Sequence, residues 1–160
     1  YFPEPSAFNF GDNLIKIPGL DGSGKMGKSE GNGVFLMDEA SVIRKKVMRA
    51  VTDSGPEKEN SKPEGAVANL FQLMKVVSEE STLKHFEETF ARCEIRYGDM
   101  KKQLAEDIVK VTTPIRERIL EIKADDAYLS RVAREGMEKA RESARQTLRD
   151  VREIIGFKAF

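Results

Sequence analysis

The chain has 160 residues, of which 39% are apolar and 34% are charged, and its formal net charge is zero. This balance is typical of a globular chain with a heavily charged surface. It excludes non-specific binding to nucleic acid through overall charge, so any such contact has to come from local patches.

The single cysteine, Cys93, excludes an internal disulfide, which suits a reducing cytoplasm, and we expect it to be a small buried apolar residue. No apolar run approaches the ~18 residues that span a bilayer, so no membrane partner is expected. The chain starts at Tyr1 rather than at a methionine, and we expect it to be a piece of something longer.

A glycine-rich loop between two short apolar runs dominates the first part of the chain. The runs at 14–17 and 34–37 have strand length, and Pro18 ends the first, so we expect a short strand at 14–17 and a second short strand or an extended stretch at 34–37. Residues 17–33, here called the lysine loop, contain six glycines and two lysines three positions apart, Lys25 and Lys28. Such a segment cannot be core. It predicts a mobile loop that carries positive charge to an anionic group.

Helical patterns fill the rest of the chain. Asp38 is a suitable N-cap for the first helix, Pro114 should kink the fourth, and Gly156 should end the last after Asp125 or Asp126 begins it. The last helix carries an apolar stripe that includes Met137 and Leu148, which we expect to face a core. The expected helices cover 39–51, 63–77, a short segment around 83–90, 98–124 and 126–155.

A polar loop at 52–65, dense in Pro, Gly, Ser and Asn, separates the first helix from the others. We place a domain boundary there, which gives one domain at 1–52 and another at 53–160. The expected fold is therefore mainly α: a small α/β fragment followed by an antiparallel α-helical bundle.

The lysine loop also satisfies a nucleotide-binding pattern, because residues 22–29 fit G-x-x-x-x-G-K-[ST]. That motif requires a helix directly after it, whose N-terminal amides hold the phosphates. Here Glu30, Gly31, Asn32 and Gly33 follow, and each glycine disfavours a helix by about 1 kcal/mol. A P-loop NTPase therefore ranks third among the interpretations, and a solvated loop without a role is a further alternative.

A longer pattern points elsewhere. KMGKS at 25–29, the EGN after it and D-x-x-x-x-I-x-K-K-h-x-x-A-h-T-D at 38–53 resemble class I aminoacyl-tRNA synthetases, and among these the tryptophanyl members most closely. FPEP near the start, IPGLDG, AVTD and PIRER extend the similarity over nearly the whole chain. The family's loop is written KMSKS, so Gly27 replaces its middle serine.

The resemblance implies an ATP site, with the 1–52 domain as the C-terminal edge of a Rossmann-like catalytic domain. In this family an amino-acid carboxylate attacks the α-phosphate of ATP, with Mg²⁺ present, and pyrophosphate leaves. Lys28 is implied as the main leaving-group cation, Lys25 as its partner, Met26 as an apolar latch and Ile17 as adenine lining. The implied ATP-binding residues are Ile17, Lys25, Met26, Gly27, Lys28 and Ser29.

The resemblance also implies that the 53–160 domain binds the tRNA anticodon. On the last helix, a stripe of arginines falls within a sector of about 80°. The alternative is a solvated face on which Glu138 and Glu142 pair with arginines three positions later. The implied tRNA contacts are Arg141, Arg145, Arg149 and, at the expected kink, Arg116.

The intact enzyme implied by the resemblance joins L-tryptophan to tRNA(Trp) in the cytoplasm, as a homodimer. The family's HIGH-like motif and amino-acid pocket are not in these 160 residues, so we expect the isolated chain to be inactive. Fragments of the tyrosyl enzyme and a free-standing helical RNA-binding module are the alternatives. His85, the only histidine, has no ligand set near it, so no metal site is predicted.

Overall fold

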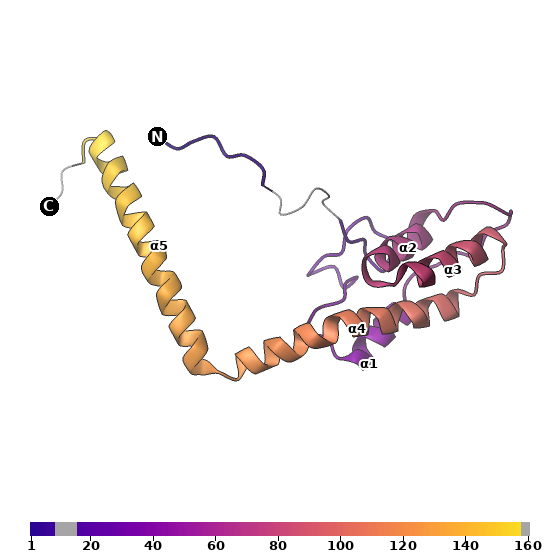
Figure 1. Cartoon of the computed structure of the whole chain (residues 1–160). Coiled ribbons are helices and arrows are strands. Elements are labelled where there is room, and N and C mark those ends of the chain that lie inside the picture. The colour runs from indigo at the N-terminus through magenta and orange to yellow at the C-terminus, as the bar shows by residue number, and fades with distance from the viewer. Residues whose placement is uncertain (9–15, 158–160) are drawn as a thin grey trace. The chain divides into compact units, whose positions relative to one another are not determined.

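The computed structural model describes residues 1–8 and 16–157, and within these ranges it contains five helices and no strand. The mainly α fold class is therefore confirmed. Figure 1 shows the helices in chain order. They are α1 (Ala40–Met48), α2 (Gly65–Val77), α3 (Glu80–Ala91), α4 (Tyr97–Lys123) and α5 (Asp126–Ile154).

The chain forms two compact units, which are described separately. One consists of Asn13–Arg118 and contains α1, α2, α3 and most of α4. The other combines Tyr1–Asp12 with Ile119–Phe160 and contains the end of α4 and all of α5. The domain boundary at residue 52 stays a prediction.

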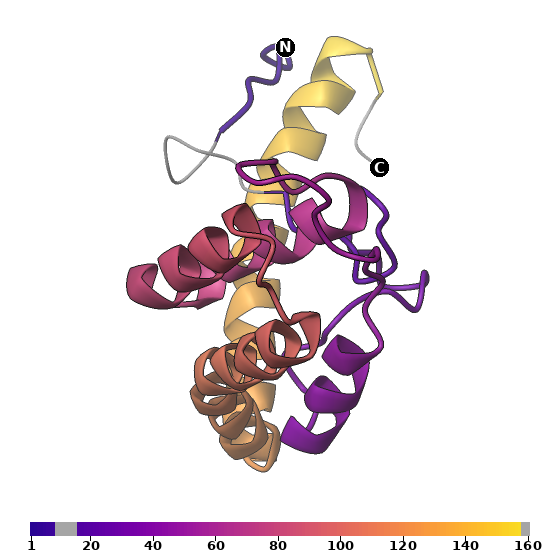
Figure 2. The ribbon, with the colours of Figure 1, turned by 90° about the vertical axis from the view of Figure 1, so that its right-hand side faces the viewer.

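The hydrophobic core belongs to the unit Asn13–Arg118. Figures 1 and 2 show α1 and the pair α2 and α3 lying along the N-terminal half of α4. Each helix contributes the apolar residues of one face, as their spacing of three and four predicts. Phe71 of α2 and Phe90 of α3 meet edge to face, with ring centroids 5.7 Å apart. The largest fully buried side chains of this core are Ile43, Val47, Val67, Leu70, Met74, Met100 and Leu104.

The expected strand at 34–37 is wrong. The amide of Asp38 donates to the carbonyl of Phe35 at 3.0 Å, which makes a turn. A strand needs a neighbour for its backbone groups, and the described residues supply none. Of the strand expected at 14–17, residues 14 and 15 lie outside the described residues, and Lys16 and Ile17 belong to no strand.

The N-cap prediction for the first helix is also wrong. Glu39 is the N-cap of α1, and its side chain makes no capping hydrogen bond. The carboxylate of Asp38 accepts instead from the amide of Phe35 at 2.9 Å and from Lys46 Nζ at 2.6 Å. A lysine about two turns into the helix thus takes the carboxylate that would have capped it.

Helix α4 continues through Pro114. Proline removes one backbone donor inside the helix. The hydroxyls of Thr112 and Thr113 donate to the carbonyls of Ile108 and Val109, at 2.8 and 2.7 Å. The buried residues of α4 end at Thr112, so the proline lies just beyond the part that packs in the core. The kink itself stays a prediction.

Helix α5 begins and ends where the sequence predicts. Asp125 is its N-cap and accepts from the amide of Tyr128 at 2.8 Å. Gly156 has φ +75°, and the amides of Gly156 and Phe157 donate back to Glu153 and Arg152 at 3.1 and 2.9 Å, a Schellman ending.

The apolar stripe of α5 is not buried within the unit that contains it. No residue of α5 is buried, and Met137 and Leu148 are 45% and 52% exposed. Periodicity identifies an amphipathic helix but does not say whether a packing partner is present. Nothing else described in the unit of α5 buries this stripe, and the bundle expected to cover it stays a prediction.

Cys93 lies just beyond the end of α3 and is exposed, so its expected burial is wrong. Its φ is +58°, a left-handed conformation that disfavours residues with a Cβ. The amides of Cys93 and Glu94 donate to Phe90 and Thr89 at 3.0 and 2.9 Å, the same ending that Gly156 provides for α5. Backbone geometry at the helix end, rather than apolar packing, therefore determines its position.

We predict that Cys93→Gly stabilises the chain by about 0.5–1 kcal/mol. Glycine removes the left-handed penalty of about 1–2 kcal/mol, and its greater freedom in the unfolded chain offsets part of that gain. Urea unfolding followed by circular dichroism measures the change. Cys93→Ala is the matched control, because it removes the thiol and keeps the Cβ. Equal stability of the two variants would show that the conformation carries no strain.

Candidate functional site

The lysine loop is tied to the core at its base. The amide of Leu20 donates to the carbonyl of Asn32 at 2.9 Å, and the amide of Met26 donates to Ile17 at 2.8 Å. The carbonyl of Leu20 accepts from Val51, just beyond α1, at 2.9 Å. Because the side chain of Leu20 is buried in the core, these bonds join the loop to the helices. Backbone hydrogen bonds therefore hold both ends of the loop.

Asn32 lies at the centre of the loop and is only 5% exposed. Its Oδ1 accepts from the amide of Gly27 at 2.9 Å. Its Nδ2 lies 2.8 Å from Ser23 Oγ, 3.1 Å from the carbonyl of Lys25 and 3.2 Å from Asp21 Oδ1. One buried carboxamide thus reaches both sides of the loop. In the sequence, Asn32 was noted only as part of the EGN after KMGKS, and no role was predicted for it.

Asp21 completes this cluster from the surface. Its Oδ1 accepts from the amide of Ser23 at 3.0 Å as well as from Asn32. Hydrogen bonds from Ser23, with a smaller contribution from Asn32, hold the pKa of the Asp21 carboxyl below its usual value. The loop is therefore arranged around an ionised Asp21 at neutral pH.

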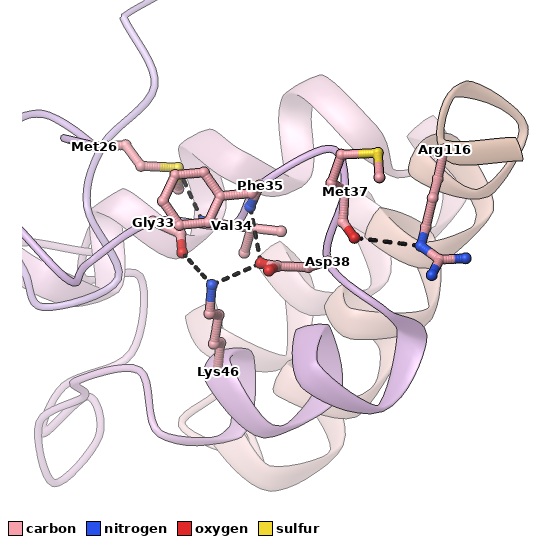
Figure 3. A network of polar contacts seen from close by, with 8 residues as sticks. All are labelled: Met26, Gly33, Val34, Phe35, Met37, Asp38, Lys46 and Arg116. Carbon is pink, nitrogen blue, oxygen red and sulfur yellow. Dashed lines mark hydrogen bonds and ion pairs between the residues drawn. The ribbon is translucent and has the colours of Figure 1, made fainter. Parts of the chain in front are cut away.

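Met26 points from the loop into the core. Its side chain packs against the core cluster, and its Sδ accepts from the amide of Val34 at 3.4 Å (Figure 3). A Cβ on Gly33 would lie 2.8 Å from Met26 Cγ, so the close approach requires glycine there. Ile17 packs against the same cluster, so two of the predicted ATP-site residues lie together.

Lys25, Lys28 and Ser29 are exposed, in contrast to Met26. Neither lysine forms an ion pair with any residue that the structure describes. The loop does not lead into a helix, because α1 begins only at Ala40. It therefore lacks the helix N-terminus that a P-loop uses to hold phosphate.

The segment after the loop is held by Lys46 of α1 (Figure 3). Lys46 Nζ donates to the carbonyl of Gly33 at 3.1 Å and to Asp38 Oδ2 at 2.6 Å. It also lies 4.6 Å from the centroid of the Phe35 ring, within the range of a cation–π contact. Lys46 thus holds the segment 33–38, which follows the loop. The run of two lysines on the first helix was its signal in the sequence.

Arg116, a predicted tRNA contact, reaches the same segment from α4. Its Nε donates to the carbonyl of Met37 at 3.2 Å (Figure 3). Its Nη2 lies 3.2 Å from Glu39 Oε1. The side chain is 29% exposed. These contacts give Arg116 a structural role between α4 and the start of α1, while RNA contact by this residue stays a prediction.

A second polar cluster joins α4 to residues 50–53. Lys101 Nζ is buried and donates to the carbonyl of Ala50 at 2.7 Å and to Thr52 Oγ1 at 3.1 Å. Burial lowers the pKa of Lys101. The hydroxyl of Tyr97 donates to Asp53 Oδ1 at 2.7 Å, and burial, with a smaller contribution from that bond, raises the pKa of Tyr97. Thr52 and Asp53 therefore bind side chains of α4.

The predicted arginine stripe of α5 is exposed along its length. Neither Glu138 with Arg141 nor Glu142 with Arg145 forms an ion pair, although both glutamates lie three positions before an arginine. The pairing that would neutralise this face is therefore not formed.

A hollow of about 380 Å³ lies between α2, α3 and the segment before α2. Ser61 Oγ is buried there without a hydrogen-bond partner, and Lys62 and Lys75 lie at the hollow. None of the predicted site residues lines it.

No group of three His, Cys, Asp or Glu side chains in residues 1–8 and 16–157 can hold a metal ion. Within the same ranges, no helix is both long enough and apolar enough to cross a membrane.

Comparison with known proteins identifies the class. A family model described as tRNA synthetases class I (W and Y) matches residues 2–113, and the chain therefore belongs to this family of class I aminoacyl-tRNA synthetases. The resemblance found in the sequence is confirmed.

The similar proteins are tryptophan enzymes. The chain is 60% identical over 158 residues to a tryptophan–tRNA ligase from Porphyromonas gingivalis, covering 99% of this chain and 48% of that protein. It is 43% identical over 136 residues to tryptophan–tRNA ligase 1 from Streptomyces coelicolor, covering 82% and 39%. The chain thus spans about half the length of the curated relatives it matches.

A solved structure has the same fold. The crystal structure of tryptophanyl-tRNA synthetase from Campylobacter jejuni, complexed with ADP and tryptophan, matches with a TM-score of 0.72 and 25% identity. The match covers 91% of this chain and 45% of that one. The helical arrangement is therefore that of the corresponding part of a tryptophanyl enzyme.

We predict that Asp21 contributes to stability above pH ~4 and that this contribution is lost as the pH falls further. The reason is that its folded-state pKa is depressed, so folding favours the ionised carboxyl and protonation must break its bonds. Unfolding free energies of the parent chain and of Asp21→Asn, measured by urea between pH 2 and pH 7, test this. The parent should be the more stable at pH 7, and the two should converge at the acid end. A gap that does not change with pH would contradict it.

Proposed function

We propose that this chain forms the ATP-facing lysine loop and the tRNA-binding helices of a tryptophan–tRNA ligase. The observation that carries the proposal is the exposed pair Lys25 and Lys28 on a loop whose residues 25–27 are held by the buried Asn32. In a class I synthetase, two unpaired cations on such a loop suit a phosphate ligand.

Tryptophan is the proposed amino acid. The family model covers tryptophanyl and tyrosyl enzymes alike, whereas the relatives at 60% and 43% identity are both named as tryptophan ligases. The solved neighbour was crystallised with ADP and tryptophan. These names favour the tryptophanyl reaction over the tyrosyl one.

The proposed chemistry is adenylate formation followed by transfer to tRNA(Trp). The tryptophan carboxylate oxygen forms a bond to the α-phosphorus of ATP, and the bond from that phosphorus to the bridging oxygen breaks. Both electrons of the broken bond leave with pyrophosphate. Negative charge therefore grows on the β- and γ-phosphates, where a positioned ammonium stabilises it.

Lys28 is the proposed leaving-group cation and Lys25 its partner. At 4 Å and an effective dielectric constant near 20, one ammonium and one phosphate charge attract by about 4 kcal/mol before desolvation. Because neither lysine is paired within the described residues, this attraction is available to a ligand. The backbone amide and the hydroxyl of Ser29 add hydrogen-bond donors, while Ile17 and Met26 are proposed to bound the adenine side.

Magnesium enters no step of this proposal. Mg²⁺ prefers several oxygen ligands, and the described residues offer no acidic cluster for it. Asp21, a carboxylate of the same loop, is already bound by Ser23 and Asn32. A magnesium ion that accompanies ATP is therefore not assigned to side chains of this chain.

The remaining parts of the enzyme are proposed to lie outside these 160 residues. They are the tryptophan pocket and the HIGH-like motif, which the sequence does not contain. We further propose that residues 1–52 complete the edge of the catalytic domain, that residues 53–160 bind the anticodon, and that the whole enzyme is a cytoplasmic homodimer.

We predict that Lys28→Ala, in a chain completed with the N-terminal half of its relatives, lowers kcat for ATP–pyrophosphate exchange by about 10²–10³-fold. The KM for tryptophan should stay within about twofold, because the lysine acts on charge that develops in the transition state. Exchange of labelled pyrophosphate into ATP measures both, with tryptophan and tyrosine compared as substrates.

Lys45→Ala is the matched control for that experiment. Lys45 is an exposed lysine of α1 with no ion pair among the described residues, and it lies outside the loop. It should leave exchange unchanged. Equal losses of exchange and of tryptophan binding in Lys28→Ala would argue against a leaving-group role. Retained tRNA binding with no exchange in the completed parent would favour a helical RNA-binding module instead.

The α5 stripe is the proposed RNA surface, because its arginines are exposed and its two candidate glutamate pairs are not formed. We predict that Arg145→Glu and Arg149→Glu each weaken tRNA(Trp) binding and reduce the slope of log K against log salt by about 1. Filter binding at several salt concentrations measures both quantities.

Lys139→Glu is the control on the same helix. It makes the same change of charge about 120° around the helix from Arg145. A smaller effect than that of the arginine variants is expected. Equal effects of all three variants would mean that overall charge, rather than this stripe, determines binding.

A further inference from the structure

We infer that Asn32 is a positioning residue that divides the lysine loop into a fixed half, residues 25–27, and a free half, residues 28–31. The inference rests on the proposed ATP role only for its catalytic consequence. Its structural part stands on the contacts of Asn32, which is nearly fully buried although its side chain is polar.

The fixed half is held on both sides of Met26. The carbonyl of Lys25 accepts from Asn32 Nδ2 at 3.1 Å, and the amide of Gly27 donates to Asn32 Oδ1 at 2.9 Å. The peptide groups before and after Met26 are therefore bound to the same carboxamide. Met26 itself is held by its amide on Ile17 and by its sulfur on Val34.

The free half has no such contacts. Among the described residues, Lys28, Ser29 and Glu30 form no hydrogen bond or ion pair, and all three are exposed. Gly31 has φ +70° and open space around it, which suits a pivot at the end of this segment. Gly27 lies at the other end, where an added Cβ would clash with Glu30 Cγ.

Only a carboxamide meets the demands of this position. Its oxygen accepts an amide hydrogen, while the two hydrogens of its nitrogen are shared among a carbonyl, a hydroxyl and a carboxylate. An aspartate here would place a second negative charge beside Asp21 and could not donate. A neutral side chain that both donates and accepts therefore joins the two sides of the loop.

The two lysines therefore differ in mobility. The backbone of Lys25 stays in place, whereas Lys28 moves with a segment bounded by Gly27 and Gly31. When the loop closes over a phosphate, only residues 28–31 lose conformational entropy, because the rest of the glycine-rich loop is already ordered. Asn32 acts on the reaction through the loop and does not touch the reacting atoms.

Limited digestion of the full chain with trypsin tests the division, because trypsin cleaves after both lysines. Cleavage after Lys28 should be about tenfold or more faster than cleavage after Lys25, after division by the same ratio in a peptide of residues 17–33. In Asn32→Ala the normalised ratio should fall toward one. Mass spectrometry of the first products measures it. Equal rates in the parent chain, or an unchanged ratio in Asn32→Ala, would overturn the inference.

Two further variants keep the test decisive. Asn69→Ala is the matched control, because Asn69 makes one bond to the loop, from Nδ2 to the carbonyl of Ser23 at 2.9 Å, and should leave the ratio high. Cleavage after the buried Lys101 reports global unfolding. If Asn32→Ala unfolds, Ser23→Ala, which removes one partner of Asn32, should give an intermediate ratio, and an unchanged ratio there overturns the inference.

Kinetics of the completed enzyme separate this inference from the proposed function. Asn32→Ala should lower kcat for exchange about tenfold and leave the KM for tryptophan unchanged. If the cleavage ratio changes in Asn32→Ala but exchange is normal in Lys28→Ala, the role of Asn32 in holding the loop stands and the ATP role is rejected. If the cleavage ratio is unchanged in Asn32→Ala but exchange is impaired in Lys28→Ala, the ATP role stands and the role of Asn32 is rejected.

Discussion

The hydrogen bonds of the Asn32 carboxamide are the constraint on which the loop depends. A segment with so many glycines loses much entropy on folding and has little apolar surface to offset that loss. Burial of one polar side chain with its partners satisfied supplies the order instead. The backbone of Leu20 transmits that order to the core, since it bonds to Asn32 on one side and Val51 on the other.

Helix α4 holds the helical core and the neighbouring loops together. Its buried face packs against the other helices, while three polar side chains along it bind loop backbone or loop side chains. Tyr97 and Lys101 hold residues 50–53, and Arg116 holds the segment before α1. The lysine loop is thus joined, through α1 and its flanking segments, to the helix that organises the rest of this unit.

Sequence reasoning succeeded where the signal was local. Asp125 and Gly156 bound α5 as predicted, because a cap and a left-handed ending involve only neighbouring residues. It failed where a distant partner decided the outcome. Asp38 was available as a cap but bonds to Lys46, and the run at 34–37 found no strand to pair with among the described residues. The apolar stripe of α5 was found, and the bundle expected to cover it stays a prediction.

By itself, the sequence determined the mainly helical class, the family resemblance and the lysine pair, because these depend on periodicity, spacing and residue type. Only the tertiary structure decided which loop residues are held and which are free. Asn32 gains its role because Gly27, Lys25 and Ser23 fold around it, and no sequence pattern predicts these contacts. The same holds for Cys93, whose exposure follows from the left-handed turn that ends α3 and not from its apolar character.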